Sequence, residues 1–420
     1  NYVPAPLSIY RNIFKLPAGG WLSVDGNGRQ LQGQYWTVKE AAQDGLNNLW
    51  VGGDSSAIDT LESLLEDATR LRMISDVPLG AFLSGGIDSS LIVALASKIA
   101  TTPVKTYSIG FEEAGFNEAE SARKIAAHLH TAHTEFFVTA EDARAVIPKL
   151  PTMFDEPFAD SSQIPTYCVA HLARRDVTVA LSGDGGDEMF AGYARYHQAE
   201  TMAQKLFLVP RPLRQVAALA MRPLGGRWSR YADVMQSKDA DDLYKQFMTF
   251  WRNPSDILAA PTPGWPVVEG LGPAPRLDGF LSRMQYCDML AYLPDDILVK
   301  VDRTSMAASL EARAPLLDYR VLEFSWRLPR SMKQRDGHGK WILRQILERH
   351  VPRELYDRPK QGFGIPLGAW LRGPLKEWAG DLLASDILIQ QGFFKADSVQ
   401  TLWRGHVSGG GGHSYRLWGI

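Results

Sequence analysis

One short segment combines residue types that bind phosphate: Ser84-Gly85-Gly86-Ile87-Asp88-Ser89-Ser90. Its two glycines permit a sharp turn that exposes successive backbone N–H groups, and the helix predicted to start behind them adds a positive dipole end. Its three serines add hydroxyl donors for the same anion. Asp88 would repel phosphate unless Mg²⁺ lies between them, because Mg²⁺ takes oxygen from carboxylate and phosphate together. The segment has neither the lysine of a Walker loop nor the glycine spacing of a dinucleotide fold. It predicts a phosphate-binding loop of another type, and the alternative is an ordinary glycine turn between strand and helix.

A second glycine-rich segment carries three acids: Leu181-Ser182-Gly183-Asp184-Gly185-Gly186-Asp187-Glu188. It again places flexible backbone and carboxylates together, directly behind a short apolar run. The residue order of a Ca²⁺ loop with its distal Glu is absent. We therefore interpret the segment as a second part of the same site, in which Asp187 joins Asp88 at a metal. A purely structural turn is the alternative.

Both segments follow predicted strands of one α/β unit. Apolar runs without alternation predict buried strands, and apolar residues at helical spacing predict helices between them. The expected strands cover 77–83, 104–111, 133–138 and 177–181, with helices over 58–74, from about 89, behind a cap at Asn117, and over 164–174. This alternation predicts a parallel, doubly wound sheet that binds ligands at the carboxyl ends of its strands. Short strands and turns are expected over 1–40, a linker over 42–56, and mainly helices after about 190.

With further segments, the two loops resemble the synthetase domain of glutamine-dependent asparagine synthetases. The further segments are Phe190-Ala191-Gly192-Tyr193, Asp155 to Ser162, Lys300 to Ala307, Glu311 to Asp318, Gly339-Lys340 with Leu343-Arg344, and Arg358 to Gly364. The resemblance runs from about residue 57 to the end and implies the α/β fold of the ATP-pyrophosphatase (adenine-nucleotide alpha-hydrolase) type. It implies that residues 1–50 are the end of a glutaminase domain plus a linker. Residues 51–420 would be the synthetase domain, with a nucleotide-binding core over 51–200 and a helical portion over 201–420.

The resemblance also implies a reaction and a set of site residues. In this family ATP adenylates aspartate, pyrophosphate leaves, and ammonia derived from glutamine displaces AMP to give asparagine. By resemblance, Asp88 and Asp187 hold Mg²⁺, and Lys360 stabilises charge at the α-phosphate. Asp184 is implied to bind the substrate amine or to accept a proton from ammonia. The implied nucleotide contacts are Leu83, Ser84, Gly85, Gly86, Asp88, Ser89, Ser90, Ile109, Ser182, Gly183 and Lys360. Glu311 is either catalytic or paired with Arg313 in a structural ion pair, and the roles of the five cations Lys300, Arg303, Arg313, Lys340 and Arg344 stay open.

Composition narrows the classes of function. The 45 basic and 47 acidic residues give a net charge of −2, which argues against nucleic acid as a partner. No apolar run reaches the roughly 18 residues of a membrane span, so no membrane partner is expected. Cys168 and Cys287 lie among apolar residues and are interpreted as packed thiols in a reducing, cytoplasmic compartment. Neither can replace the nucleophilic cysteine of a glutaminase.

The expected partners are therefore small molecules: aspartate, and ammonia delivered by a glutaminase domain that this sequence lacks. We interpret the sequence as a piece of a longer protein, and a homodimer is one possible assembly. The closest alternative is an amidotransferase of the same family that acts on another acid, in surface-sugar or secondary-metabolite biosynthesis. A tRNA-modifying ATP pyrophosphatase and a non-catalytic nucleotide-binding subunit are the other two.

Overall fold

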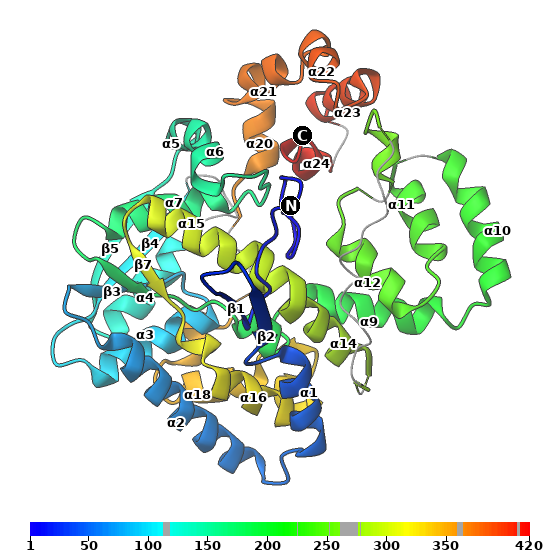
Figure 1. Cartoon of the computed structure of the whole chain (residues 1–420). Coiled ribbons are helices and arrows are strands. Elements are labelled where there is room, and N and C mark those ends of the chain that lie inside the picture. The colour runs from blue at the N-terminus through cyan, green and yellow to red at the C-terminus, as the bar shows by residue number, and fades with distance from the viewer. Residues whose placement is uncertain are drawn as a thin grey trace.

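A five-stranded parallel sheet forms the centre of the part of the chain that carries both loops (Figure 1). The computed structural model describes residues 1–111, 118–224, 226–251, 253–260, 276–277, 279–358, 364–409 and 412–420. The strand order is β5-β4-β3-β6-β7, and every neighbouring pair is parallel. The strands are β3 (Leu79–Phe82), β4 (Lys105–Gly110), β5 (Ala132–Phe137), β6 (Val179–Leu181) and β7 (Glu311–Arg313). The predicted doubly wound α/β fold is confirmed. The expected cap at Asn117 lies outside the described residues.

Helices cover both faces of this sheet, and the sequence of each strand explains why. Successive residues of a strand point to opposite faces, and on β6 Ala180 and Leu181 belong to two different apolar clusters. The first-half helices are α1 (Val38–Asn47), α2 (Asp54–Met73), α3 (Ile87–Ile99), α4 (Ala119–His128), α5 (Ala140–Val146), α6 (Leu150–Phe154), α7 (Gln163–Ala173) and α8 (Gly186–Met189). In Figure 1, α2 and α3 lie on one side of the sheet and α7 on the other.

The second half of the chain is mainly helical, as expected, but it also supplies strand β7. A helix of π type over Asp288–Leu298 runs directly into α15 (Val299–Ala307). Its α-helices otherwise are α9 (Ala194–Leu206), α10 (Arg211–Met221), α11 (Gly226–Met235), α12 (Ala240–Met248), α14 (Gly279–Cys287), α16 (Tyr319–Arg327), α17 (Arg330–Lys333), α18 (Trp341–Glu348), α19 (Arg353–Tyr356), α20 (Leu367–Arg372), α21 (Lys376–Leu382), α22 (Ser385–Gln391), α23 (Ala396–Val407) and α24 (Ser414–Trp418).

The expected linker over 42–56 is wrong at both ends, because α1 extends to Asn47 and α2 already begins at Asp54. Thr37 caps this helix by accepting a hydrogen bond from the backbone N–H of Glu40. Ala42 is fully buried, and a Cβ at Gly45 would lie 2.8 Å from the backbone carbon of Trp326 on α16. The glycine thus permits close helix packing here, where sequence inspection took it as a sign of a flexible linker.

The amino-terminal residues form an antiparallel hairpin of β1 (Gly20–Val24) and β2 (Gln30–Gln34), which confirms the expected short strands. Several of its large apolar side chains face solvent, with exposed fractions of 44% for Trp21, 57% for Val24 and 53% for Leu31. The hairpin buries little core of its own, as expected for so short a piece.

Candidate functional site

The first loop joins the carboxyl end of β3 to the start of α3, as the sequence predicted. Gly85 has φ +73°, and a Cβ there would lie 2.9 Å from the backbone nitrogen of Ala122. The hydroxyls of Ser84 and Ser89 lie 2.9 Å apart and fix the turn. The loop therefore turns sharply at a glycine, with hydroxyl groups and the α3 amino terminus on one side of it.

The second loop follows β6, the neighbour of β3 in the sheet, so the two loops meet. Gly185 has φ +99°, which favours glycine. A Cβ at Gly183 would lie 2.7 Å from the backbone nitrogen of Ser89, and a Cβ at Gly186 would overlap the Asp88 carboxylate. The glycines of the second loop thus leave the space that the first loop and Asp88 occupy.

Asp88 and Asp187 converge on one cation, the ammonium group of Lys340. The Lys340 Nζ lies 2.7 Å from Asp187 Oδ1 and also contacts Asp88 Oδ2. Burial of Lys340 opposes its charge, but Asp187 and Asp88 outweigh burial and raise the pKa of this lysine. Lys340 is therefore a buried cation between the two carboxylates.

Backbone geometry holds Lys340 in this place. It has φ +58° immediately before α18, and its N–H donates to the carbonyl of Phe190 at 2.8 Å. A Cβ at Gly192 would overlap both Asp187 and Lys340, and a Cβ at Gly339 would overlap the Ala191 carbonyl. The two glycines permit this close approach between the segment after α8 and the start of α18.

The two carboxylates fit a magnesium site completed by phosphate. They already surround a positive charge, and Mg²⁺ is often held by one or two carboxylates together with phosphate oxygens and water. Within the described ranges, no group of three or more His, Cys, Asp or Glu side chains is placed to hold a metal ion. Asp88 and Asp187 as the residues that would hold the ion stay a prediction.

Asp184, also in the second loop, lies close to a buried ion pair. Burial raises the pKa of Asp184, and Lys300 is a nearby positive charge that opposes the rise. Lys300 Nζ lies 2.9 Å from Asp160 Oδ2 and donates to Ser162 Oγ at 2.8 Å. The sequence identified the segment with Asp160 and Ser162 by resemblance, but it did not show that they anchor Lys300 beside Asp184.

Glu188 is a further buried acid, whose surroundings the sequence did not reveal. Burial, with the charge of Asp187 added, raises the pKa of Glu188 to about 7. The Tyr193 hydroxyl donates to its carboxylate at 2.6 Å. Gln285 donates to the backbone carbonyl of Glu188 at 2.6 Å. These bonds anchor α8, the short helix that begins inside the second loop.

Three further predicted residues, Leu83, Ile109 and Glu311, lie in apolar clusters or at the first residue of a strand. The side chains of Leu83 and Ile109 are 1% and 4% exposed and pack into separate apolar clusters, so lining of a nucleotide pocket by them stays a prediction. Glu311 pairs with Val179 at the beginning of β7, away from the loops at the carboxyl edge. Its Oε1 lies 2.6 Å from Nε of Arg313, so the expected ion pair is present, and a catalytic role of Glu311 stays a prediction.

Lys360 lies outside the described residues, and its catalytic role stays a prediction. Two positions earlier, Arg358 donates from Nη2 to the Ser84 carbonyl at 3.2 Å. The chain therefore enters the segment that contains Lys360 from a position beside the first loop.

The five cations whose roles the sequence left open each contact a carboxylate. The pairs are Lys300 with Asp160, Arg303 with Asp155, Arg313 with Glu311, Lys340 with Asp88 and Asp187, and Arg344 with Asp357. Of these, only Lys340 contacts both predicted metal ligands.

Comparison with known proteins agrees with the family resemblance found in the sequence. The model of the asparagine synthase family matches residues 60–420. A candidate asparagine synthetase (glutamine-hydrolyzing) of Mycobacterium tuberculosis is 34% identical over 429 aligned positions, covering 100% of this chain and 64% of the relative. Asparagine synthetase (glutamine-hydrolyzing) 1 of Bacillus subtilis is 29% identical, covering 100% of this chain and 66% of the relative. A protein named amidase chry2 in Gibberella zeae is 22% identical, with 94% of this chain and 64% of that protein aligned. The chain thus spans just under two thirds of the length of the mycobacterial relative.

Proposed function

Because this chain belongs to the asparagine synthase family, we propose that it converts aspartate to asparagine with consumption of ATP. The aspartate β-carboxylate attacks the α-phosphorus of ATP, and pyrophosphate leaves. Ammonia then attacks the β-aspartyl-adenylate, and AMP leaves as the amide forms. The observation that carries this proposal is the meeting of the two loops, which brings Asp88 and Asp187 to one buried cation.

The first half-reaction concentrates negative charge, so the site must neutralise it. Asp88 and Asp187 would hold Mg²⁺, which when bound neutralises phosphate charge. We assign the backbone and hydroxyls of the first loop, from Ser84 to Ser90, to the pyrophosphate end of ATP. Lys360 is assigned to the developing charge at the α-phosphate, supported by the position of Arg358 beside Ser84.

The second half-reaction needs a group that receives a proton when ammonia becomes an amide nitrogen. We assign this role, or the binding of the substrate amine, to Asp184. Burial raises the pKa of Asp184, which makes its carboxylate a better proton acceptor. The backbone of Ser182 and Gly183 is assigned to the nucleotide.

The nitrogen source belongs to the intact protein. The two bacterial relatives carry glutamine hydrolysis in their names, and they are longer than this chain. We propose that residues 1–50 are the end of a glutaminase domain with its linker and that residues 51–420 are the synthetase domain. Both cysteines are free thiols, which supports a reducing cytoplasm as the place of the reaction. Dimerisation stays a prediction.

A second candidate keeps the chemistry and changes the acceptor acid. The fungal relative aligns with 94% of this chain and is named an amidase, so a protein similar to this chain carries the name of another activity. In this version a carboxylic acid other than aspartate is adenylated at the same two loops.

One assay separates the two candidates. Purified protein receives ATP, Mg²⁺ and ammonium with aspartate or with a panel of other acids, and pyrophosphate and product mass are measured. Aspartate-dependent pyrophosphate with asparagine supports the first candidate, whereas release only with another acid supports the second. Asp187→Asn should abolish the release, while Asp59→Asn, at an exposed pair with Arg349, should leave it unchanged. Equal pyrophosphate release without any acid would contradict both candidates.

A further inference from the structure

The segment from Lys205 to Arg222, here called the basic arm, differs in charge from the chain as a whole. It contains Lys205, Arg211, Arg214 and Arg222 but no Asp or Glu, in a chain of net charge −2. It covers the end of α9 and all of α10. In Figure 1, α10 and α11 lie at the edge of the molecule, on the side away from the sheet. A segment with this charge fits an anionic partner.

Helix α10 within the basic arm exposes several large apolar side chains and buries one arginine. A surface helix normally turns charged residues to water and apolar residues inward. Here Arg214 is buried and donates to the carbonyls of Val209, Met235 and Ser237 at 3.1, 3.1 and 2.8 Å. The outward apolar residues are Leu213, Val216 and Leu219, with exposed fractions of 61%, 65% and 66%.

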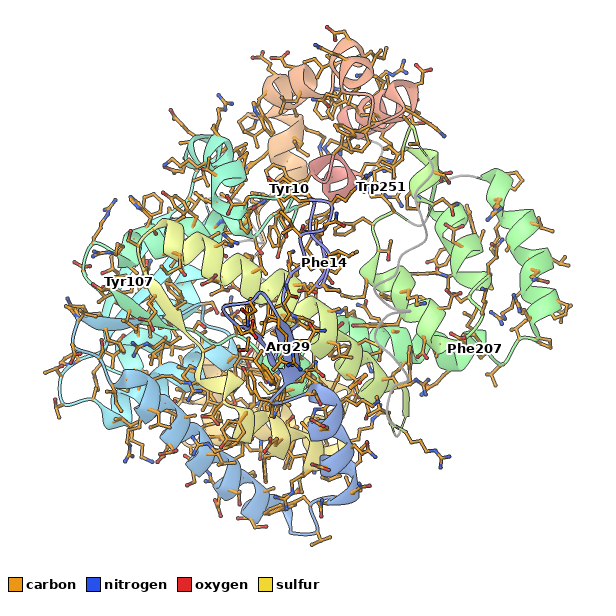
Figure 2. The ribbon with its side chains drawn as sticks, in the orientation of Figure 1. Tyr10, Phe14, Arg29, Tyr107, Phe207 and Trp251 are labelled. Carbon is orange, nitrogen blue, oxygen red and sulfur yellow. The ribbon has the colours of Figure 1, made fainter. Side chains whose placement is uncertain are left out.

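The apolar surface continues into the turn before α10. Phe207, Leu208 and Val209 are 36%, 82% and 41% exposed. Figure 2 labels Phe207 in this helical region, well apart from Tyr107 of the sheet. Lys205 and Arg211 are exposed along the same segment, and so is Arg222, which also lies 3.8 Å from Asp233 of α11. An apolar face accompanied by basic side chains is the arrangement that lies in the interface of an anionic bilayer.

We propose that the basic arm docks this protein onto the surface of an anionic lipid bilayer. No described helix is long and apolar enough to cross a membrane, so the contact is at the surface. A second copy of the chain is a poorer occupant, because it would bring like charges together. This proposal revises the expectation that the protein has no membrane partner, and it is independent of the acceptor acid.

Flotation of the full chain with lipid vesicles tests the proposal. Binding to phosphatidylcholine vesicles that contain phosphatidylglycerol should exceed binding to pure phosphatidylcholine by at least about tenfold, and high salt should reduce it. The combined variant Leu213→Ser, Val216→Ser and Leu219→Ser should lose most of this binding. The matched control changes Leu382 and Ile389 to Ser, which are 50% and 70% exposed on α21 and α22, and it should bind like the wild type.

A second measurement removes charge without changing the apolar face. Lys205→Gln with Arg211→Gln should shift release from the vesicles to lower salt concentration, because two exposed basic side chains are lost. Absence of flotation with anionic vesicles would overturn the proposal. So would equal binding of the triple serine variant and the wild type. A doubling of the molar mass in light scattering that the triple variant abolishes would assign the face to a second copy instead.

Discussion

Removal of Lys340 is the perturbation that tests the candidate site most directly. Its side chain is 5% exposed, against 14% for Asp88 and 16% for Asp187. Loss of one partner from a buried ion pair costs about 3–5 kcal/mol, because the remaining charge stays out of water without compensation. We therefore expect Lys340→Met to lower the free energy of unfolding by about this amount. The two carboxylates then repel each other, and Mg²⁺ should restore part of the loss by supplying a new positive charge.

Guanidinium unfolding followed by tryptophan fluorescence, with and without Mg²⁺, measures this effect. The matched control is Lys124→Met, which breaks an ion pair of 2.7 Å with Glu120 in which both side chains are more than half exposed. The control should unfold at the wild-type denaturant concentration, because exposed pairs contribute little. Our explanation of the site would be refuted if Lys340→Met also unfolded at the wild-type denaturant concentration and if Mg²⁺ stabilised this variant no more than the wild type.

Three further predictions concern packing and pH. Gly192→Ala places a Cβ on Asp187 and Lys340, so pyrophosphate release should fall by about 100-fold because the site residues are displaced. The control Gly53→Ala, at a glycine with open space around it, should leave pyrophosphate release unchanged. Gly45→Ala forces α1 against Trp326 of α16, and the denaturation midpoint should show a loss of about 1–3 kcal/mol; an unchanged midpoint would contradict the close packing. Burial lowers the pKa of Lys333 from 10.5 to about 7. Between these pH values the unfolded state binds more protons than the folded state. The free energy of unfolding therefore rises with pH, by up to about 1.4 kcal/mol per pH unit. Lys333→Met should flatten this slope in unfolding curves measured from pH 7 to 10, and a slope equal to that of the wild type would exclude Lys333 as its source.

The central strands of the sheet could be predicted from the sequence, because each strand is a short apolar run that is visible in its own residues. It was insufficient for β7, whose three residues Glu311, Ala312 and Arg313 form no apolar run. This strand exists because its backbone pairs with β6, and single-sequence patterns do not contain such distant pairing. The same limit explains why the second half of α1 was expected to be a linker: its helical state depends on packing against α16, which lies far away in the sequence.

Within the site, sheet topology made the meeting of the two acidic loops predictable. Asp88 and Asp187 lie after adjacent parallel strands, so their proximity could be expected from the two loops alone. The position of Lys340 could not be predicted in this way, because Lys340 contacts Asp88 across a sequence separation of 252 residues. The local signals were present in Gly192 and Gly339, but glycine alone does not say which chain segment will approach it.

The late position of β7 has a consequence for synthesis of the protein. Its partner β6 leaves the ribosome about 130 residues earlier, yet β7 covers the β6 edge of the sheet. An uncovered parallel strand is a site for pairing with other chains, and nascent domains generally fold from the amino terminus onward. The two acidic loops therefore lie on an unfinished sheet until residue 313 has emerged, and this interval is when a chaperone would be needed.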